Sequence, residues 1–484
     1  MEKVSTVENH RNTMLARKYE KAKSYLDSFV NYERNTSFSY RRALKLKRVR
    51  HLFDVLGIAY RRLKVIHIAG TKGKGSTAHF CAYLLVASGF KVGLYTSPHF
   101  FSFRERIKIL TPQGLQVSNS LISRSDVVRI IHQIQPQLER LRFSRTLGKL
   151  TFFEVYTAIA LKYFIESNID FAVLETGLGG RLDATNIVNP CGCLITHIGY
   201  DHTDKLGNRL ADIASEKAGI VKKGAWVVSS SQRRSALEVI RAKCAQLDVP
   251  LYLFGRDFFA ENVRLKRDCT LFDFCFHAFQ LRNVRIYLKG NSQVENAALS
   301  LAATVLFNEN MSLKSEQSKG APGPLKINTM NFKRGLAETA IEGRFEIVQH
   351  NPLVIMDVAH NPSSFSVLEQ NLKTYFPHKK IILIFAVSDD KDVKAMLGKI
   401  RYSRIILTSF SSPRSLAPHQ IRKKCALKET IVACDIHQAY DISKQLYTKD
   451  SLILISGSLF LVSEAKKMFT VQAASDKYHH YARI

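Results

Sequence analysis

The chain has 484 residues, of which 46% are hydrophobic and 23% charged, and this composition excludes a disordered protein. No run approaches the ~18 uncharged apolar residues of a membrane-spanning helix, and the start, MEKVSTVENH, lacks the apolar core of a secretory signal. We therefore expect a soluble, cytoplasmic protein without a membrane partner, and its length predicts roughly two to three domains.

The formal net charge of +30 admits two interpretations. A basic protein can bind nucleic acid or an anionic substrate, or it can simply carry lysines and arginines on its solvated faces. The sequence has no RNA-binding or helicase-like motif and no block of five or six like charges. We favour the interpretation that lysines and arginines are dispersed over the solvated surface, and we expect no specific nucleic-acid partner.

In chain order, residues 1–60 show helical spacing of apolar residues, and from residue 64 the pattern becomes strand, turn, helix, strand. KVIHIA is a β-branched strand, GTKGKGS a turn, TAHFCAYLLVASG a helix, and KVGLYTS the next strand. This βαβ unit predicts a parallel sheet. Buried strands follow at IDFAVLE, CLITHI and AWVVSS, and short alternating strands near 250–290 predict a small antiparallel sheet.

A polar stretch with glycine and proline, NENMSLKSEQSKGAPGP, predicts a linker, after which a second α/β pattern begins. Its strands are LVIMD, KIILIFA, RIILTSF, TIVAC and SLILIS. We predict an α/β protein with an N-terminal P-loop-type domain over residues 1–308, a linker over 309–326, and a Rossmann-like domain over 327–484.

The strongest local signal is the glycine-rich turn between the strand at 65–69 and the following helix. Its residues are Gly70, Thr71, Lys72, Gly73, Lys74, Gly75 and Ser76. Backbone N–H groups and the helix N-terminus at such a turn cradle phosphates, and Lys74 is placed to reach the β/γ-phosphates. The spacing departs from the strict G-x-x-x-x-G-K-[ST] form, but the strand-turn-helix context predicts nucleotide binding.

A nucleotide phosphate loop requires magnesium, so oxygen ligands are expected where neighbouring strands end. Ser97 ends KVGLYTS, Glu175 ends IDFAVLE, and His202 follows CLITHIGYD. Each residue also has a purely structural interpretation. Ser97 can cap the turn before a proline, Glu175 can be a surface carboxylate, and His202 can be a hydrogen-bonded loop residue. Imidazole is also a poor ligand for a hard cation, which weighs against His202 on spacing alone.

At this point a family resemblance emerges. HIAGTKGKGST, SPHFFSFRERI, LTFFEVYTAIAL, ETGLGGRLDATNIV, HIGYDHTDKLG and SEKAGIVKKG resemble, in order, motifs of the folylpolyglutamate synthase/dihydrofolate synthase family within the Mur ligase superfamily. EGRFEIV, IMDVAHNP and SDDKDV resemble the motifs of the second domain. The resemblance covers nearly the whole chain, from about Tyr25 to Phe469.

The resemblance implies an ATP-dependent ligase. ATP phosphorylates the carboxylate of dihydropteroate or a reduced folate, and the amino group of L-glutamate then displaces phosphate to form an amide. The family uses two magnesium ions, whose ligands match Ser97, Glu175 and His202. Lys217 matches a lysine that is carbamylated in the family and then acts as an anionic ligand; the alternative is an ordinary lysine on a helix face. A monomer is expected.

Further site residues follow from the same resemblance. Asn296, Arg344, Asp357 and His360 match positions that hold the nucleotide, and we expect them on the second domain. Thr151, Phe153 and Asp183 match positions that contact the pterin ring, although Phe153 lies in an apolar run and can equally be a core residue. As catalytic residues we expect Lys74, Lys217 and His202.

The sequence departs from the family pattern at several positions, including Lys72 in place of the usual asparagine. Two alternatives therefore stay open: a different Mur-type ligase acting on another carboxylate, and a basic nucleic-acid-binding NTPase. GLGGRLDATN favours the folate acceptor, and no motif for a uridine nucleotide is found.

Overall fold

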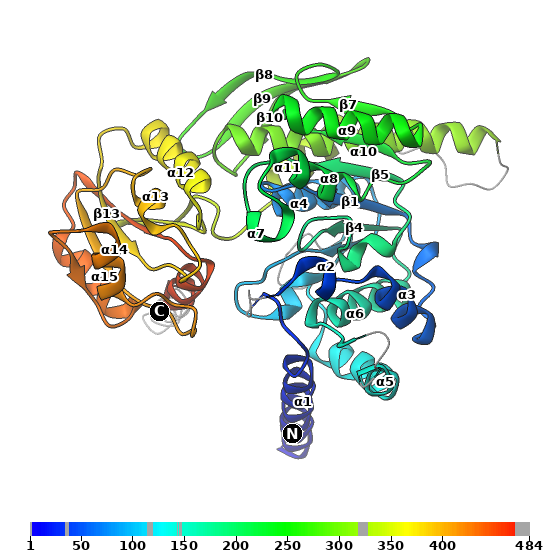
Figure 1. Ribbon diagram of the computed structural model, residues 1–484, viewed down its shortest axis with the longest axis horizontal. Helices are drawn as coiled ribbons and strands as arrows, with labels where there is room; N and C mark the ends of the chain where they lie inside the picture. Colours follow the sequence, from blue (N-terminus) through cyan, green and yellow to red (C-terminus); the bar gives the residue numbers. More distant parts are fainter. Residues whose placement is uncertain are drawn as a thin grey trace. The chain divides into compact units, whose positions relative to one another are not determined.

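The computed structural model describes residues 2–33, 38–113, 120–142, 144, 148–317 and 328–469 (Figure 1). Its contacts divide the chain into two compact units. The first comprises Met1–Val263, Leu271–Ile286 and Asn291–Thr339, and the second comprises Arg264–Thr270, Tyr287–Gly290 and Ala340–Ile484. The two predicted α/β domains are thus present. Two short segments that lie within the sequence range of the first unit belong to the second.

The domain boundaries differ from the predicted ones. Helix α10 (Asn291–Gln317) continues through the first part of the predicted linker, and residues 318–326 of that linker lie outside the described residues. Helix α11 (Thr329–Glu338) packs on α4 (Lys74–Ala87) in the first unit, so the second unit resumes at Ala340 and not at residue 327. Glutamate, lysine and leucine in the first part of the polar segment are good helix formers, which accounts for the helix as far as Gln317.

The first unit is built on a mostly parallel sheet, seven-stranded within the described residues, in the order β3-β2-β4-β1-β5-β6-β7. Its strands are β1 (Val65–Ala69), β2 (Val92–Tyr95), β3 (Ile107–Leu110), β4 (Phe171–Glu175), β5 (Gly192–Ile195), β6 (Trp226–Ser229) and β7 (Leu251–Leu253). The predicted strands KVIHIA, IDFAVLE, CLITHI and AWVVSS are confirmed. β3 pairs antiparallel with β2 at one edge.

Helices cover both faces of this sheet (Figure 1). α4 contacts β1, β2 and β4, while α10 contacts β5 and β6. On the opposite face Val65 and Leu174 join a core with α1, α3, α5 and α6, and Ile195 joins a core with α8 and α9. The remaining helices are α1 (Glu2–Asp27), α2 (Tyr40–Ala43), α3 (Leu46–Val55), α5 (Arg124–Arg142), α6 (Phe152–Glu166), α7 (Thr203–Leu206), α8 (Leu210–Ala218) and α9 (Arg234–Leu247). Three short 3₁₀ helices are η1 (Tyr60–Arg62), η2 (Phe103–Arg106) and η4 (Ala184–Ile187).

The predicted antiparallel accessory sheet is also present. It comprises β8 (Phe258–Leu265), β9 (Thr270–Phe276) and β10 (Phe279–Ile286), in the order β10-β9-β8. Alternate residues of β9 such as Phe272, Phe274 and Phe276 are buried, which is the period-two pattern that identified it in the sequence.

The second unit is a six-stranded sheet in the described residues, ordered β11-β12-β16-β13-β14-β15. Only β11 runs antiparallel to its neighbour. The strands are β11 (Glu346–His350), β12 (Leu353–Asp357), β13 (Lys380–Phe385), β14 (Arg404–Leu407), β15 (Ile431–Val432) and β16 (Ser451–Ser456), and the helices include α12 (Pro362–Tyr375), α13 (Val393–Leu397), α14 (Pro418–Cys425) and α15 (Ile436–Leu446). This topology confirms the Rossmann-like prediction.

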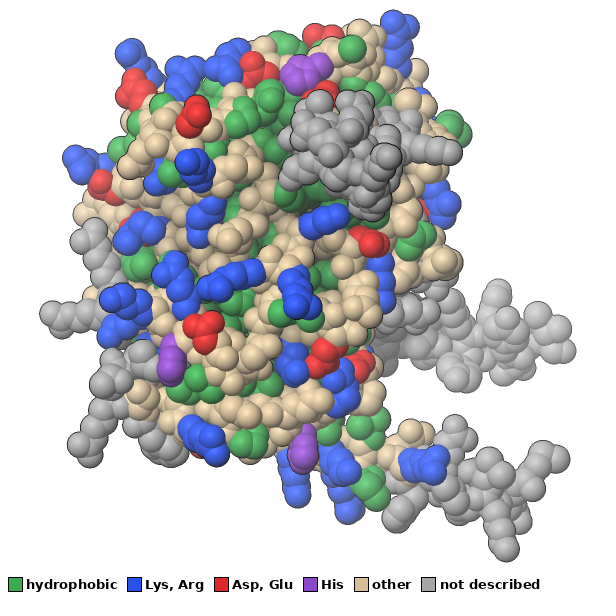
Figure 2. Space-filling model, turned by 90° about the vertical axis from the view of Figure 1, so that its right-hand side faces the viewer, with side chains coloured by type: hydrophobic (Ala, Val, Ile, Leu, Met, Phe, Trp, Pro, Cys, Tyr) green, Lys and Arg blue, Asp and Glu red, His purple; other side chains and the backbone are tan. Residues whose placement is uncertain are grey.

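Among the described helices, none has a segment both long and apolar enough to cross a bilayer. Figure 2 shows lysine and arginine side chains scattered over the face that it draws, with acidic side chains between them. On this face the net charge is therefore dispersed and not gathered into one patch.

Candidate active site

The glycine-rich turn leaves the end of β1 and leads into α4, as predicted. Gly73 precedes α4 with φ +87°, and a Cβ there would lie 2.3 Å from Asn296 Oδ1. At Gly70 a Cβ would lie 1.8 Å from Thr196 Oγ1. Because neither position has room for a side chain, the two glycines are required by the fold of the loop.

The segment that follows β5 holds the loop in place. The amides of Thr71 and Lys72 donate to the carbonyl of His197 at 2.9 and 3.2 Å, and the Thr71 hydroxyl donates to the carbonyl of Gly199 at 3.1 Å. The first amides of α4 have no partner within the helix, and the helix dipole adds partial positive charge at the same point. This arrangement can bind phosphate.

Two lysines lie in this loop. Lys74 is the first residue of α4. Burial lowers the pKa of Lys72 to about 8, and Asp201 opposes this shift. A second cation close to the phosphate-binding amides increases the positive potential of the loop.

Asn296 lies beside the loop, but on α10 of the first unit, not on the second domain where we expected it. Its Oδ1 accepts a hydrogen bond from the Thr77 hydroxyl at 3.3 Å, and its Nδ2 donates to Gln293 Oε1 at 3.1 Å. The predicted first domain, residues 1–308, already included this position, and the helix that carries Asn296 packs on α4.

Glu175 and Ser97 come together at the same edge of the sheet. Glu175 is only 4% exposed, and its Oε2 accepts a hydrogen bond from the amide of Ser97 at 3.0 Å. The same oxygen lies 3.5 Å from where a Cβ on Gly75 would be. A buried carboxylate thus borders the phosphate loop and a hydroxyl-bearing residue adjoins that carboxylate, and oxygen ligands of this kind suit a hard cation.

His202 has a different environment. It is exposed and takes a left-handed conformation, φ 49°, just before α7. The described residues contain no group of three or more histidine, cysteine, aspartate or glutamate side chains placed to bind a metal ion. The role of His202 as a ligand stays a prediction.

Lys217, near the end of α8, reaches the phosphate loop. Its side chain is buried, and Nζ donates to the carbonyl of Gly70 at 2.7 Å. Burial, reinforced by Lys74, lowers the pKa of Lys217 to about 7, whereas Asp201, Asp183 and Glu216 oppose the shift. At neutral pH a large fraction of this amine is uncharged and nucleophilic.

The loop after β4 is organised by Asp183. Its Oδ2 accepts hydrogen bonds from the amides of Gly177 and Leu178, both at 2.9 Å, and its Oδ1 accepts from the Thr185 amide at 3.0 Å and the Thr185 hydroxyl at 2.6 Å. Burial raises the pKa of Asp183, but these donors act in the opposite direction. Asp183 therefore fixes the shape of the loop.

The other two expected pterin-site residues lie at the start of α6. The Thr151 hydroxyl caps this helix by accepting from the Glu154 amide at 3.2 Å. The partly exposed ring of Phe153 packs on the loop after β4, since a Cβ on Gly177 would lie 2.7 Å from Phe153 Cζ. Phe153 and Asp183 thus both adjoin Gly177, while Thr151 is occupied as a cap.

Sequence analysis missed two buried polar pairs around this site. His67, in the middle of β1, lies 2.8 Å from the Thr185 hydroxyl through Nε2, and burial lowers the pKa of His67 to about 3. Arg48 forms a buried ion pair with Glu154 at 2.7 Å. The sequence around these residues gives no signal for either pair, because both depend on contacts between distant segments.

In the second unit, Asp357 ends β12. Its Oδ2 accepts from the Phe345 amide at 2.9 Å, and its Oδ1 accepts from the Ala359 amide at 2.8 Å. Burial raises the pKa of Asp357, and Arg344 opposes this shift from nearby. His360 Nδ1 lies 2.9 Å from the carbonyl of Val358. These three predicted residues therefore gather around the end of one strand.

Comparison with known proteins agrees with this geometry. Residues 127–304 match the Mur ligase middle domain, and residues 343–459 match the Mur ligase glutamate ligase domain. The dihydrofolate synthase/folylpolyglutamate synthase of Bacillus subtilis is 32% identical over 87% of this chain and 94% of its own. The folylpolyglutamate synthase of Lacticaseibacillus casei is 31% identical over 87% of this chain and 93% of its own.

Solved structures give the same result. The folylpolyglutamate synthase of Mycobacterium tuberculosis complexed with ADP superimposes with a TM-score of 0.82 at 27% identity, covering 94% of this chain and 99% of that one. A folylpolyglutamate synthase complex with AMPPCP and folate gives a TM-score of 0.77 at 28% identity, covering 93% and 99%. These relatives favour a folate-type acceptor over another Mur ligase substrate. The chain belongs to the dihydrofolate synthase/folylpolyglutamate synthase family of ATP-dependent ligases.

Proposed function

We propose that this enzyme joins L-glutamate to the carboxylate of a pteroate or folate at the loop between β1 and α4. A carboxylate oxygen of the acceptor attacks the γ-phosphorus of ATP, which releases ADP and leaves an acyl phosphate. The amine of glutamate then attacks the acyl carbon, phosphate departs, and the nitrogen loses a proton to solvent. The observation that carries this proposal is the loop itself, with Lys217 and Asn296 against it.

The chain's own residues bind the anionic groups and stabilise the charge that develops on them. The amides at the start of α4 hold phosphate oxygens, and Lys74 stabilises charge on the transferred phosphoryl group. Asn296 fixes the position of the loop through Thr77 and the space beside Gly73. Arg344, Asp357 and His360 are proposed to contact the nucleotide from the second unit, with Asp357 suited to ribose hydroxyls and Arg344 to phosphate.

The residues at the strand ends fit magnesium. This ion prefers one or two carboxylates with substrate phosphates and water, so Glu175 and Ser97 beside the loop meet its requirement without a larger protein cage. When bound, magnesium offsets the negative charge of the phosphates. We propose Glu175 and Ser97 as ligands, with His202 as a further ligand and two ions in all.

Lys217 is proposed to be carbamylated. An uncharged amine can react with carbon dioxide, and burial gives Lys217 an uncharged fraction at neutral pH. The carbamate would replace a buried amine near Lys74 by an anion that supplies oxygen ligands. Mass spectrometry of the intact native protein tests this directly. An added 44 Da that is present with bicarbonate and absent from Lys217→Met is expected, whereas an unmodified Lys217 contradicts the proposal.

The decisive experiment measures L-glutamate-dependent phosphate release from ATP with 7,8-dihydropteroate and with a reduced folate as acceptors. Turnover with either acceptor supports the proposed reaction, and the preferred acceptor assigns the activity to dihydrofolate synthesis, polyglutamate extension or both. No turnover with either, in the presence of magnesium and bicarbonate, would contradict the proposed acceptor class.

We further propose that the enzyme is a cytoplasmic monomer. All eight cysteines are free in the described residues, as suits a reducing compartment. Sedimentation equilibrium is expected to give the mass of one chain, and a concentration-independent dimer would contradict this proposal.

A further inference from the structure

Two of the residues expected to contact the pterin ring, Thr151 and Phe153, lie at the start of α6, and Glu154 follows them in the same turn. Glu154 Oε2 accepts a hydrogen bond from the Thr151 amide at 2.8 Å, and the Thr151 hydroxyl accepts from the Glu154 amide at 3.2 Å. This reciprocal arrangement is a capping box. The Glu154 carboxylate thus fixes the backbone of Thr151 and the direction of the first turn of α6.

The carboxylate of Glu154 is buried and paired with Arg48 of α3. Arg48 is 3% exposed and Glu154 is 2% exposed. Arg48 Nη2 donates to Glu154 Oε1 at 2.7 Å, and Nε donates to both carboxylate oxygens at 3.0 Å. The same Nη2 donates to the carbonyl of Ala43, the last residue of α2, at 2.7 Å. Burial raises the pKa of Glu154, and Arg48 and the Thr151 amide oppose this shift. One guanidinium therefore connects α2, α3 and α6.

Stability alone does not account for this ion pair. Taking two charges out of water costs free energy, and replacing a buried ion pair by apolar side chains of similar size is often neutral or stabilising. The surroundings suit such a replacement, because Val155 of α6 and Val49 and Leu52 of α3 belong to one apolar core. Apolar side chains do not reproduce the direction of the contact, since a planar fork of donors meets a carboxylate in a defined geometry.

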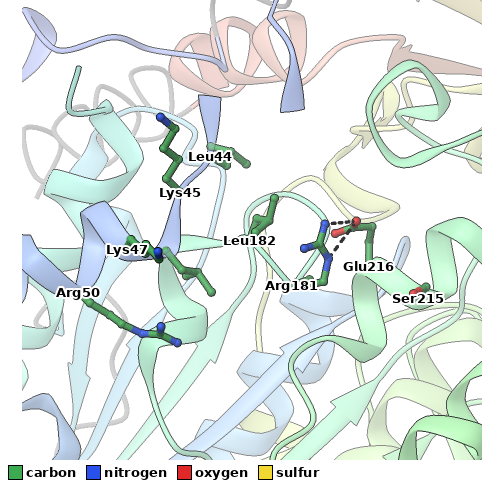
Figure 3. Close-up of a pocket in the computed structure, with 9 residues that line it drawn as sticks. Leu44, Lys45, Lys47, Arg50, Arg181, Leu182, Ser215 and Glu216 are labelled. Carbon is green, nitrogen blue, oxygen red and sulfur yellow. Dashed lines mark hydrogen bonds and ion pairs between the residues drawn. The ribbon is translucent and has the colours of Figure 1, made fainter. Parts of the chain in front are cut away.

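The charge of Arg48 is used inside the protein, unlike the charges of its neighbours on α3. Lys47 and Arg50 line a pocket of about 670 Å³ beside the start of this helix (Figure 3). Arg48 is instead held by Glu154 on α6. We therefore expect Arg48 to act on the segments that it connects, and not through direct contact with an anion.

Phe153 is the side chain that this turn of α6 directs toward the loop after β4. A Cβ on Gly177 would lie 2.7 Å from Phe153 Cζ, so the ring is in close contact with that loop. The centroid of the ring lies 5.9 Å from that of Tyr95. The ring is partly exposed and can contact a ligand. A small rotation of the first turn of α6 would move the ring away from Gly177.

We propose that Arg48 and Glu154 are positioning residues for the acceptor: their ion pair, acting through the cap at Thr151, holds Phe153 where the pterin ring binds. This inference rests on the proposed function, because it takes Phe153 as a contact to the acceptor. It makes the buried pair a determinant of acceptor affinity. A pair that only stabilised the fold would instead affect stability and all substrates together.

The test is steady-state kinetics of the full-length double variant Arg48→Met/Glu154→Leu, with whichever of 7,8-dihydropteroate and a reduced folate the unmodified enzyme turns over. We expect the Michaelis constant for the acceptor to rise about tenfold, as for a small misplacement of a binding group, while that for ATP is unchanged. The urea midpoint should stay close to that of the unmodified enzyme, because no buried charge is left unpaired. Arg48→Lys keeps the charge but not the planar fork, and should raise the acceptor constant by less.

A matched control is the ion pair at the other end of the same helix. Arg129 Nη1 donates to Glu166 Oε2 at 2.6 Å, which joins α5 to the last residue of α6. The double variant Arg129→Met/Glu166→Leu removes the same two residue types and should leave the Michaelis constants for acceptor and ATP unchanged.

Three results would overturn the proposal: an unchanged acceptor constant in the folded double variant, an equal rise in the constants for acceptor and ATP, or the same selective rise in the control. If the double variant does not fold, Arg48→Lys supplies the comparison, and an acceptor constant equal to that of the unmodified enzyme contradicts the role of Arg48. Failure of the proposed function is a separate result, because the unmodified enzyme would then show no glutamate-dependent phosphate release with either acceptor.

Discussion

The loops that follow β1 and β4 leave the same edge of one parallel sheet, where Ile68 is paired with Glu175, yet they are built differently. The loop after β1 contains Gly70 and Gly73, where a side chain would clash with neighbouring residues, and it leads into the N-terminus of α4. The loop after β4 folds back on its own carboxylate, Asp183, which accepts four hydrogen bonds from within the loop and η4.

The difference shows that polar groups at one sheet edge can have two roles: some are available to bind a ligand, and others stabilise the conformation of their own loop. In the first loop the donors belong to the backbone, and glycine allows a ligand to approach them. In the second loop the acceptor belongs to a side chain, and its partners are already present. Substitutions in the first loop should therefore alter catalysis, and substitutions at Asp183 should mainly alter stability.

The largest expected effect is that of Lys74→Ala in the first loop. We propose that Lys74 acts on the transferred phosphoryl group, and its removal is then expected to lower kcat at least about a hundredfold, as for loss of one preorganised donor in other enzymes. The steady-state rate of phosphate release measures kcat. Lys223→Ala, which removes an exposed lysine before β6, is the matched control and should leave kcat unchanged. If kcat of Lys74→Ala stays near that of the unmodified enzyme, the loop does not act on the phosphoryl group.

The next effect concerns Lys217 and pH. Its pKa is about 7 in the folded protein and 10.5 ordinarily, so between these values the unfolded state binds more protons and stability rises with pH. Below about pH 7 both states are protonated and this increase is absent. The difference in unfolding free energy between the unmodified protein and Lys217→Met should thus rise, by a few kcal/mol at most, from pH 7 toward pH 10.

Urea unfolding in carbon-dioxide-free buffer checks this prediction, because carbamylation would otherwise change the titrating group. Lys223→Met is a suitable control, since its side chain is exposed and its substitution should give no pH-dependent difference. Parallel stability curves for the unmodified protein and Lys217→Met would show that Lys217 keeps an ordinary pKa.

A third prediction tests the second loop. Asp183→Ala leaves the amides of Gly177, Leu178 and Thr185 without their acceptor and is expected to cost about 2–4 kcal/mol of unfolding free energy. Asp183→Asn retains acceptor capacity at one oxygen and should cost less. Urea unfolding measures both, and the Michaelis constant for dihydropteroate is measured beside it. A large rise in that constant without any loss of stability would instead make Asp183 a contact to the pterin.

Much of this architecture follows from local sequence patterns. β-branched runs predicted β12 and β16 with their observed bounds, and the strand-turn-helix pattern placed the phosphate loop. These features depend on neighbours along the chain, because alternation and glycine spacing are local properties. The family resemblance added Lys217, which the structure places at Gly70.

Local sequence patterns do not predict contacts between distant segments of the chain. Asn296 touches the loop only because α10 packs on α4, and the Arg48–Glu154 pair joins segments 106 residues apart. The extension of α10 to Gln317 was missed because its polar composition suits both an exposed helix and a linker. Nor does any sequence signal reveal that the acceptor positions of Asp183 are already used.

The smallest effect is expected at Lys72, the cation that replaces the usual asparagine of the first loop. Its amide is already committed to His197, so the backbone of the loop does not depend on the side chain. Burial lowers the pKa of Lys72 to about 8, and near neutral pH most of its charge is retained.

Lys72→Asn should therefore raise the Michaelis constant for ATP about threefold, the size of one partly screened charge, while kcat is nearly unchanged. The effect should shrink above pH 8, where the unmodified side chain also loses its charge. A fall in kcat comparable to that of Lys74→Ala would show instead that both lysines act on the transferred phosphoryl group, and that the loop after β1 stabilises the transition state with two cations.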